Sequence, residues 1–120
     1  MTPRIALLTR LYDAYNKGDF DAFAAELDPA VDWPDQIGGG RVVGVEAMRA
    51  FWARRDGMVR VEAAPMDFTV LEDGRIAVAT NQTVHNLEGR LWSDSCVRHI
   101  YTFQDERVSR MDIVERLDEA

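Results

Sequence analysis

The spacing of apolar residues changes partway along this 120-residue chain. Up to about residue 56 they recur mostly at three- and four-residue steps, which is typical of helices with one buried side. From residue 59 onwards the chain reads as strands separated by turn residues. Helices and strands segregated in this way favour an α+β fold, in which helices cover one face of a curved sheet. No internal repeat or linker appears, so we expect residues 1–120 to form a single domain.

Three helices are predicted in the first half. The first covers residues 4–17 and ends at Gly18, a residue type that commonly follows a helix. Asp19 is a suitable N-cap for the second, whose apolar stripe extends to Leu27, just before Pro29. The third covers residues 45–56. Between the second and third helices, residues 31–44 contain three consecutive glycines and are expected to form a small hairpin or a loop.

Four strands are predicted at residues 59–71, 75–87, 91–103 and 108–115. Pro65 favours an edge position or a bulge in the first of them, and Asp73-Gly74 indicates a hairpin turn between the first and the second. Regular alternation in the third strand places His99 on the concave face, and Trp92 and Ile100 on the opposite face. Because large apolar residues on an outer sheet face need cover, we expect a homodimer through Trp92 and Ile100.

Charge and composition exclude several classes of partner. The net charge of −7 comes from 21 acidic and 14 basic residues, without the basic stripe of a nucleic-acid binder. No apolar run approaches the roughly 20 residues of a membrane span, so no membrane partner is expected and the protein is expected to be cytoplasmic. Cys96 is the only cysteine and the chain has two histidines, so neither a disulfide nor a metal site is predicted.

Three local patterns resemble the NTF2-like superfamily, which includes the SnoaL-like and ketosteroid-isomerase-like domains. They are YNKGDF at residues 15–20, VGVEAMRAFW at residues 43–52 and VRHIYTF at residues 97–103. The resemblance implies a cone, in which three N-terminal helices pack on a curved, mostly antiparallel sheet around a pocket for a small apolar molecule. The superfamily includes isomerases, polyketide cyclases, dehydratases, epoxide hydrolases and non-catalytic members, and many of its members dimerise through the outer sheet face.

The positions that match the catalytic groups of a ketosteroid isomerase carry other residues here. Trp33 stands at the position of its carboxylate base, Leu11 at that of its tyrosine and His99 at that of its acid. All three depart from the isomerase pattern, so classical ketosteroid isomerase activity is not expected.

Four residues are candidates for chemistry in the pocket. His99 can transfer protons near neutral pH, and the alternative is a core histidine bonded to a backbone carbonyl or a tyrosine. Asp32 and Asp35 flank Trp33-Pro34, and either could act as base while His99 acts as acid. The alternative for both is a solvated turn carboxylate. Tyr12, on the inward stripe of the first helix, could donate to a carbonyl oxygen or simply pack in the core.

Further apolar and aromatic residues are expected either to line the pocket or to form plain core. These residues are Tyr15, Trp33, Met48, Phe51, Trp52, Val97, Tyr101 and Met111. Two functions stay open on these grounds. One is a cofactor-free isomerase, cyclase, dehydratase or hydrolase that acts by acid–base catalysis on an apolar carbonyl-bearing or cyclic substrate. The other is a non-catalytic ligand-binding or dimerisation module.

Overall fold

The computed structural model describes residues 3–35 and 38–116 of the chain. The helices are α1 (Pro3–Lys17), α2 (Phe20–Ala24) and α3 (Val45–Asp56). The strands are β1 (Leu27–Pro34), β2 (Arg41–Val43), β3 (Val59–Val70), β4 (Ile76–Asn86), β5 (Leu91–Gln104) and β6 (Arg107–Arg116). No helix in the described ranges combines the length and the apolar character needed to cross a bilayer.

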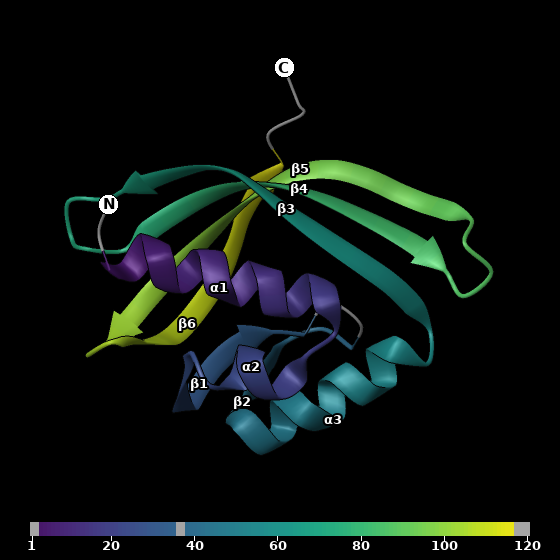
Figure 1. The fold of residues 1–120 in the computed structure, drawn as a ribbon, viewed down its shortest axis with the longest axis horizontal. Coiled ribbons are helices and arrows are strands. Elements are labelled where there is room, and N and C mark those ends of the chain that lie inside the picture. Colours follow the sequence, from purple (N-terminus) through teal and green to yellow (C-terminus); the bar gives the residue numbers. More distant parts are fainter. Residues whose placement is uncertain (1–2, 36–37, 117–120) are drawn as a thin grey trace.

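All six strands form one sheet, in the order β2-β1-β6-β5-β4-β3. Every neighbouring pair is antiparallel except β1 and β6, which are parallel, so the sheet is mixed. The long strands β3 to β6 arch over α1, while β1, β2, α2 and α3 lie below it (Figure 1). The apolar core therefore fills the concave side of the sheet, and α1 lies within the arch.

The second helix is shorter than the sequence predicts, and its last expected residue belongs to a strand. α2 ends at Ala24, while Leu27 opens β1, where it pairs with Val108 of β6. The register of this pair shifts between Leu27 and Asp32, so the exposed Pro29 lies in an irregular stretch that does not need its missing N–H. The three helices are therefore not consecutive along the chain, because β1 and β2 lie between α2 and α3.

Three predictions about turns and strands are confirmed. β3 is an edge strand whose register with β4 shifts between Pro65 and Asp67, as the proline indicates. Gly74 adopts a φ of 91° in the turn between these strands, a backbone conformation that favours glycine. The segment at residues 31–44 does contain a hairpin, in which β1 and β2 pair from Asp32↔Val43 to Pro34↔Arg41.

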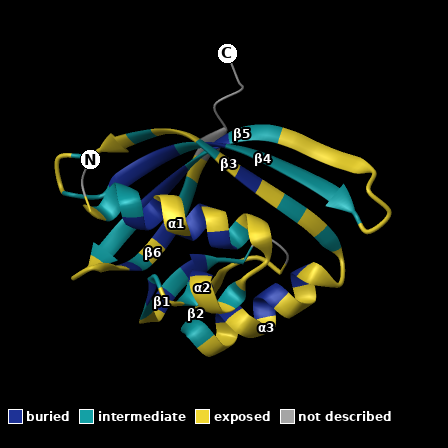
Figure 2. Cartoon of the chain, viewed as in Figure 1, coloured by how far each residue is buried: buried dark blue, intermediate teal, exposed yellow. Residues whose placement is uncertain are grey.

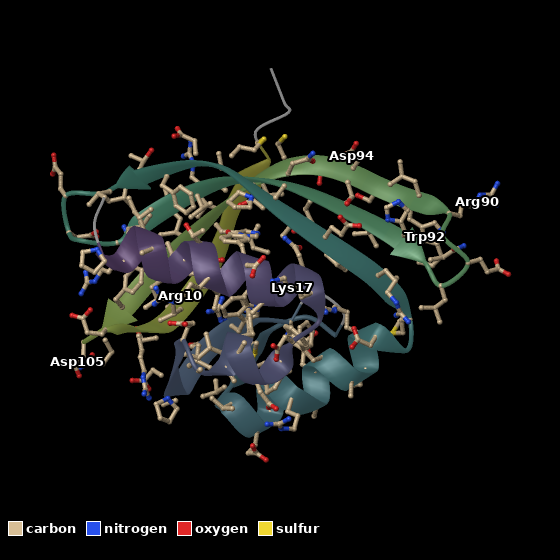
Figure 3. The ribbon with its side chains drawn as sticks, in the orientation of Figure 1. Arg10, Lys17, Arg90, Trp92, Asp94 and Asp105 are labelled. Atoms are coloured by element: carbon tan, nitrogen blue, oxygen red, sulfur yellow. The ribbon has the colours of Figure 1, made fainter. Side chains whose placement is uncertain are left out.

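The far end of the β4–β5 hairpin projects beyond the helices, and Trp92 lies there beside Arg90 and Asp94 (Figure 3). Figure 2 shows this end of β5 as exposed. Both Leu91 and Trp92 are accessible at this end of the strand, at 53% and 63% exposure. Ile100 differs from Trp92, because it is only 9% exposed within this chain. Of the two residues predicted for the dimer face, Trp92 is therefore the exposed one, and Ile100 adds almost nothing to the exposed apolar surface.

Candidate ligand-binding site

Side chains from one helix and two strands meet in a polar cluster inside the core. In the sheet, Val78 pairs with His99 and Ile76 with Tyr101, so Thr80, His99 and Tyr101 all point to the concave face. Tyr12 of α1 reaches the same place from the inward side of the helix. All four members of the cluster are buried, with exposures of 0–5%.

The Tyr12 hydroxyl is the hub of this cluster. Its oxygen lies 2.8 Å from His99 Nδ1, 3.1 Å from Thr80 Oγ1 and 3.0 Å from the Tyr101 hydroxyl. The Thr80 hydroxyl in turn donates to the carbonyl oxygen of Val78 at 3.1 Å. The cluster therefore contains four hydrogen bonds, and it holds four protons: one on each of three hydroxyls and one on a neutral imidazole.

Only one arrangement gives each of these bonds a proton. Thr80 must donate to the Val78 carbonyl, because a carbonyl only accepts, so Tyr12 must donate to Thr80. The Tyr12 proton is then used, and Tyr101 and His99 both donate to the Tyr12 oxygen. The network thus assigns the imidazole proton to Nδ1 of His99 and leaves a bare lone pair on Nε2.

His99 Nε2 is buried and has no hydrogen-bond partner among the residues that the structure describes. Burial lowers the pKa of His99 to about 4, so the ring is neutral at neutral pH. Burial also raises the pKa of Tyr12 and of Tyr101, which keeps both phenols protonated. The site therefore offers an uncharged hydrogen-bond acceptor, held in place by two tyrosines and a threonine.

A small cavity adjoins His99. Its volume is about 20 Å³, which is room for about one water molecule. Its lining combines aromatic, aliphatic and amide side chains: Leu11, Tyr12, Tyr15, Phe23, Trp33, Ala63, Gln82, His99, Tyr101 and Met111. Below it, the Phe23 ring packs against the rings of Trp33 and Trp52, with centroids 5.4 and 4.9 Å apart. The cavity thus has a largely aromatic wall, with polar atoms supplied by side chains such as His99 and Gln82.

A larger groove shares one lining residue, Gln82, with this cavity. It has a volume of about 410 Å³ and lies between α3 and strands β3 and β4. The groove is mostly apolar, with one charged residue: Phe51, Arg55, Met58, Val59, Val61, Gln82 and Val84. Its volume falls within the range of pockets that hold drug-sized molecules, roughly 300–1,000 Å³.

The structure brings together some of the candidate residues and separates others. Tyr12, Tyr15, Trp33, His99, Tyr101 and Met111 share the cavity lining, and Phe51 lines the groove. Met48, Trp52 and Val97 are buried but lie in neither lining. Thr80 and Gln82 were not singled out from the sequence, although their alternation with Val78 along β4 was a signal that could have found them.

Neither candidate aspartate joins His99. Val31 and Trp33 of β1 point into the core, so Asp32 between them points to the outer side. There its carboxylate binds Arg41 Nε at 2.6 Å and Arg110 Nη1 at 2.9 Å. Within the described part of the chain, the cavity lining holds no carboxylate, so the expected pairing of His99 with an aspartate is not formed.

Asp35 organises the loop that follows β1. Its Oδ1 accepts the backbone N–H of Gly38 at 2.7 Å, and its Oδ2 lies 3.4 Å from Arg54 Nη2. Its role here is that of a turn carboxylate. Over the described residues, no group of three or more histidine, cysteine or acidic side chains is arranged to hold a metal ion.

Comparison with known proteins gives a family and a fold. The family model of the SnoaL-like domain matches residues 8–111. Among solved structures, TerC crystallised with polyporic acid superposes with a TM-score of 0.82 at 23% identity, over 94% of this chain and 91% of that one. An NTF2-like protein of unknown function from Burkholderia pseudomallei gives a TM-score of 0.83 at 22% identity, over 95% and 91%.

A third similar structure is a computationally designed binder of 17-OHP, with a TM-score of 0.80 at 16% identity over 98% of this chain and 96% of that one. Comparison with curated proteins found no match. The structural likenesses are all below 25% identity and show the fold. The family model spans most of the chain and gives the identity: this protein belongs to the SnoaL-like family of the NTF2-like superfamily.

Proposed function

We propose that this protein binds a small, largely apolar molecule whose hydroxyl group donates a hydrogen bond to His99 Nε2. The observation that carries the proposal is the buried, unpartnered Nε2, held as an acceptor by the Tyr12 network. A buried polar atom without a partner costs about 1–3 kcal/mol, and a ligand hydroxyl would recover that cost. The ligands of similar folds support the general class, since TerC was crystallised with polyporic acid and the designed protein binds 17-OHP.

The two adjoining spaces suggest how such a ligand would lie. The cavity beside His99 accommodates only about 20 Å³, so it suits the hydroxyl end, while the groove of about 410 Å³ suits the apolar body. Gln82 lines both spaces, so a ligand that reached from one to the other would contact its side chain.

Acid–base catalysis by His99 is the second candidate function. The same bare Nε2 favours it, because a neutral imidazole lone pair can accept a proton from a substrate. The low pKa of about 4 makes the ring a weak base, and no carboxylate assists it among the described lining residues. Binding is therefore better supported than turnover, and an isomerase, cyclase, dehydratase or hydrolase activity would have to rely on His99 alone.

The binding proposal predicts a preference for a hydroxyl over its methyl ether. We expect 2-naphthol to bind about tenfold more tightly than 2-methoxynaphthalene, because the ether cannot donate to Nε2. His99→Asn should abolish the preference, since its amide can replace the Nδ1 donor toward Tyr12 but provides nothing at the Nε2 position. Titration calorimetry on the wild type and on His99→Asn measures the ratio of the two affinities in each protein.

The outcomes of that titration separate the candidates. Equal affinity of the wild type for both compounds would contradict the hydroxyl-binding role. Turnover of a substrate that His99→Asn loses, with its binding retained, would instead favour the catalytic role.

We also propose that the protein forms a homodimer, with Trp92 in the interface. Trp92 is 63% exposed, and a buried tryptophan is among the residues that contribute most to association. Sedimentation at micromolar concentration should show a dimer, and Trp92→Ser should weaken association at least about tenfold. Val43→Ser, at an equally exposed position on β2, is the control and should leave the dimer intact. A monomeric wild type would refute the proposal.

A further inference from the structure

Arg55 is a buried cation in the wall of the groove. It is only 7% exposed, and its guanidinium lies 4.8 Å from the ring centroids of both Tyr15 and Trp52. In the part of the chain that the structure describes, its ion pair is a contact of 3.3 Å from Nη2 to Asp56, whose side chain is 55% exposed. Its Nε is buried without a partner among the described residues. A buried arginine of this kind retains unused capacity to donate hydrogen bonds.

The surroundings of Arg55 are electropositive, although the chain as a whole carries a net charge of −7. Arg55 and Val61 also line a neighbouring hollow of about 310 Å³. Among its described lining residues, that hollow has three cations, Lys17, Arg55 and Arg60, and a single carboxylate, Asp56; Lys17 is also paired with Asp13 at 2.9 Å, which leaves Arg55 and Arg60 as its main positive groups. The guanidinium of Arg60 donates to backbone carbonyls, so its charge is not neutralised there.

Apolar surface and positive charge thus meet at one residue. The groove that Arg55 lines is otherwise mostly apolar, with Phe51, Met58, Val59 and Val84, and the hollow that Arg55 also lines contains the positive charge of Arg60. A neutral apolar ligand would use only the first of these surfaces. A ligand with an anionic end would use both, and a carboxylate matches the planar guanidinium particularly well.

We infer that the groove selects amphipathic carboxylates, with the carboxylate bound by Arg55 and the apolar chain lying between α3 and strands β3 and β4. The inference rests on the proposed function, since it gives the chemical class of the ligand that enters the cone. Arg55 then selects for the negative charge of the ligand, whereas His99 selects for its hydroxyl group.

Octanoate and octanamide provide a matched pair of probes, because they share size and shape and differ in charge. By titration calorimetry, the wild type should bind octanoate at least about tenfold more tightly than octanamide. Arg55→Gln should reduce the ratio to about one, and Arg55→Lys should keep part of it. Arg75→Gln removes one positive charge from the turn between β3 and β4, outside the lining of both spaces, and is the control for general electrostatic attraction; it should change the ratio by no more than about twofold.

A second measurement needs no variant that could fail to fold. In ¹H–¹⁵N NMR of the wild type, the Nε–H signal of Arg55 should shift on addition of octanoate and stay in place with octanamide. Equal affinities in the wild type, a ratio that survives Arg55→Gln, or an unmoved Nε–H signal would each overturn the inference.

The naphthol titration distinguishes failure of the inference about Arg55 from failure of the proposed function. If the wild type binds octanoate and octanamide equally while its preference for 2-naphthol over the ether still depends on His99, only the inference about Arg55 is refuted. If octanoate binds at Arg55 while His99→Asn leaves the naphthol ratio unchanged, the role of His99 falls and the anion groove stands.

Discussion

Tyr12→Phe should lower the free energy of unfolding by about 3 kcal/mol, since a typical buried hydrogen bond contributes about 1 kcal/mol and this change removes three. The phenylalanine ring fills the same space, so the loss comes from the hydroxyl alone. It leaves His99 Nδ1–H and the Tyr101 hydroxyl without their acceptor inside the core. Urea denaturation followed by fluorescence measures the change.

Tyr101→Phe is the matched control for this prediction. It removes the same chemical group from the same cluster, but the Tyr101 hydroxyl makes one bond, to Tyr12. We expect a loss of about 1 kcal/mol. Equal losses for the two variants would mean that Tyr12 is not the hub of the network, and the proton assignment on His99 would lose its basis.

The stability of the protein should depend on pH through His99. Its pKa is about 4 in the folded chain against an ordinary value of 6.5, because burial disfavours the charged ring. Between these values the unfolded chain binds more protons than the folded one, so the free energy of unfolding rises as the pH rises through this window. Conversely, acidification from about pH 7 to about pH 4 should remove about 3 kcal/mol through this one group.

His99→Asn isolates that contribution, because carboxylates also titrate over part of the range. The difference in free energy of unfolding between wild type and His99→Asn should change by about 3 kcal/mol across the window, with the wild type losing more on acidification. Parallel pH profiles for the two proteins would show that the folded state accepts a proton on His99 at its ordinary pKa.

Local patterns in the sequence were sufficient for most of the fold. Helical spacing located α1 and α3, and the turn at Gly74 fixed the β3–β4 hairpin. The end of α2 could not be found this way, because Leu27 fits a helical stripe after Phe23 as well as a strand. Its place in β1 is decided by parallel pairing with Val108, a contact between residues far apart in the sequence.

The site was predictable only where it depends on the periodicity of a single element. Alternation along β5 put His99 and Tyr101 on one face, and helical spacing put Tyr12 on the inward side of α1. Asp32 differs, because part of its surroundings comes from a distant segment. Asp32 is bound by Arg110, which lies 78 positions away in the sequence. No sequence pattern indicated a role for Arg55 either, since its burial depends on how Tyr15 and Trp52 pack around it.

The most direct test of the central claim is the protonation of the two His99 ring nitrogens, read by long-range ¹H–¹⁵N NMR at about pH 7, where the neutral ring dominates. The network predicts that Nδ1 carries the proton and Nε2 is bare in the free protein, and that 2-naphthol shifts the Nε2 signal while 2-methoxynaphthalene does not. A proton on Nε2 in the free protein, or an Nε2 signal that 2-naphthol leaves unchanged, would contradict the assignment of His99 as the acceptor for a ligand hydroxyl.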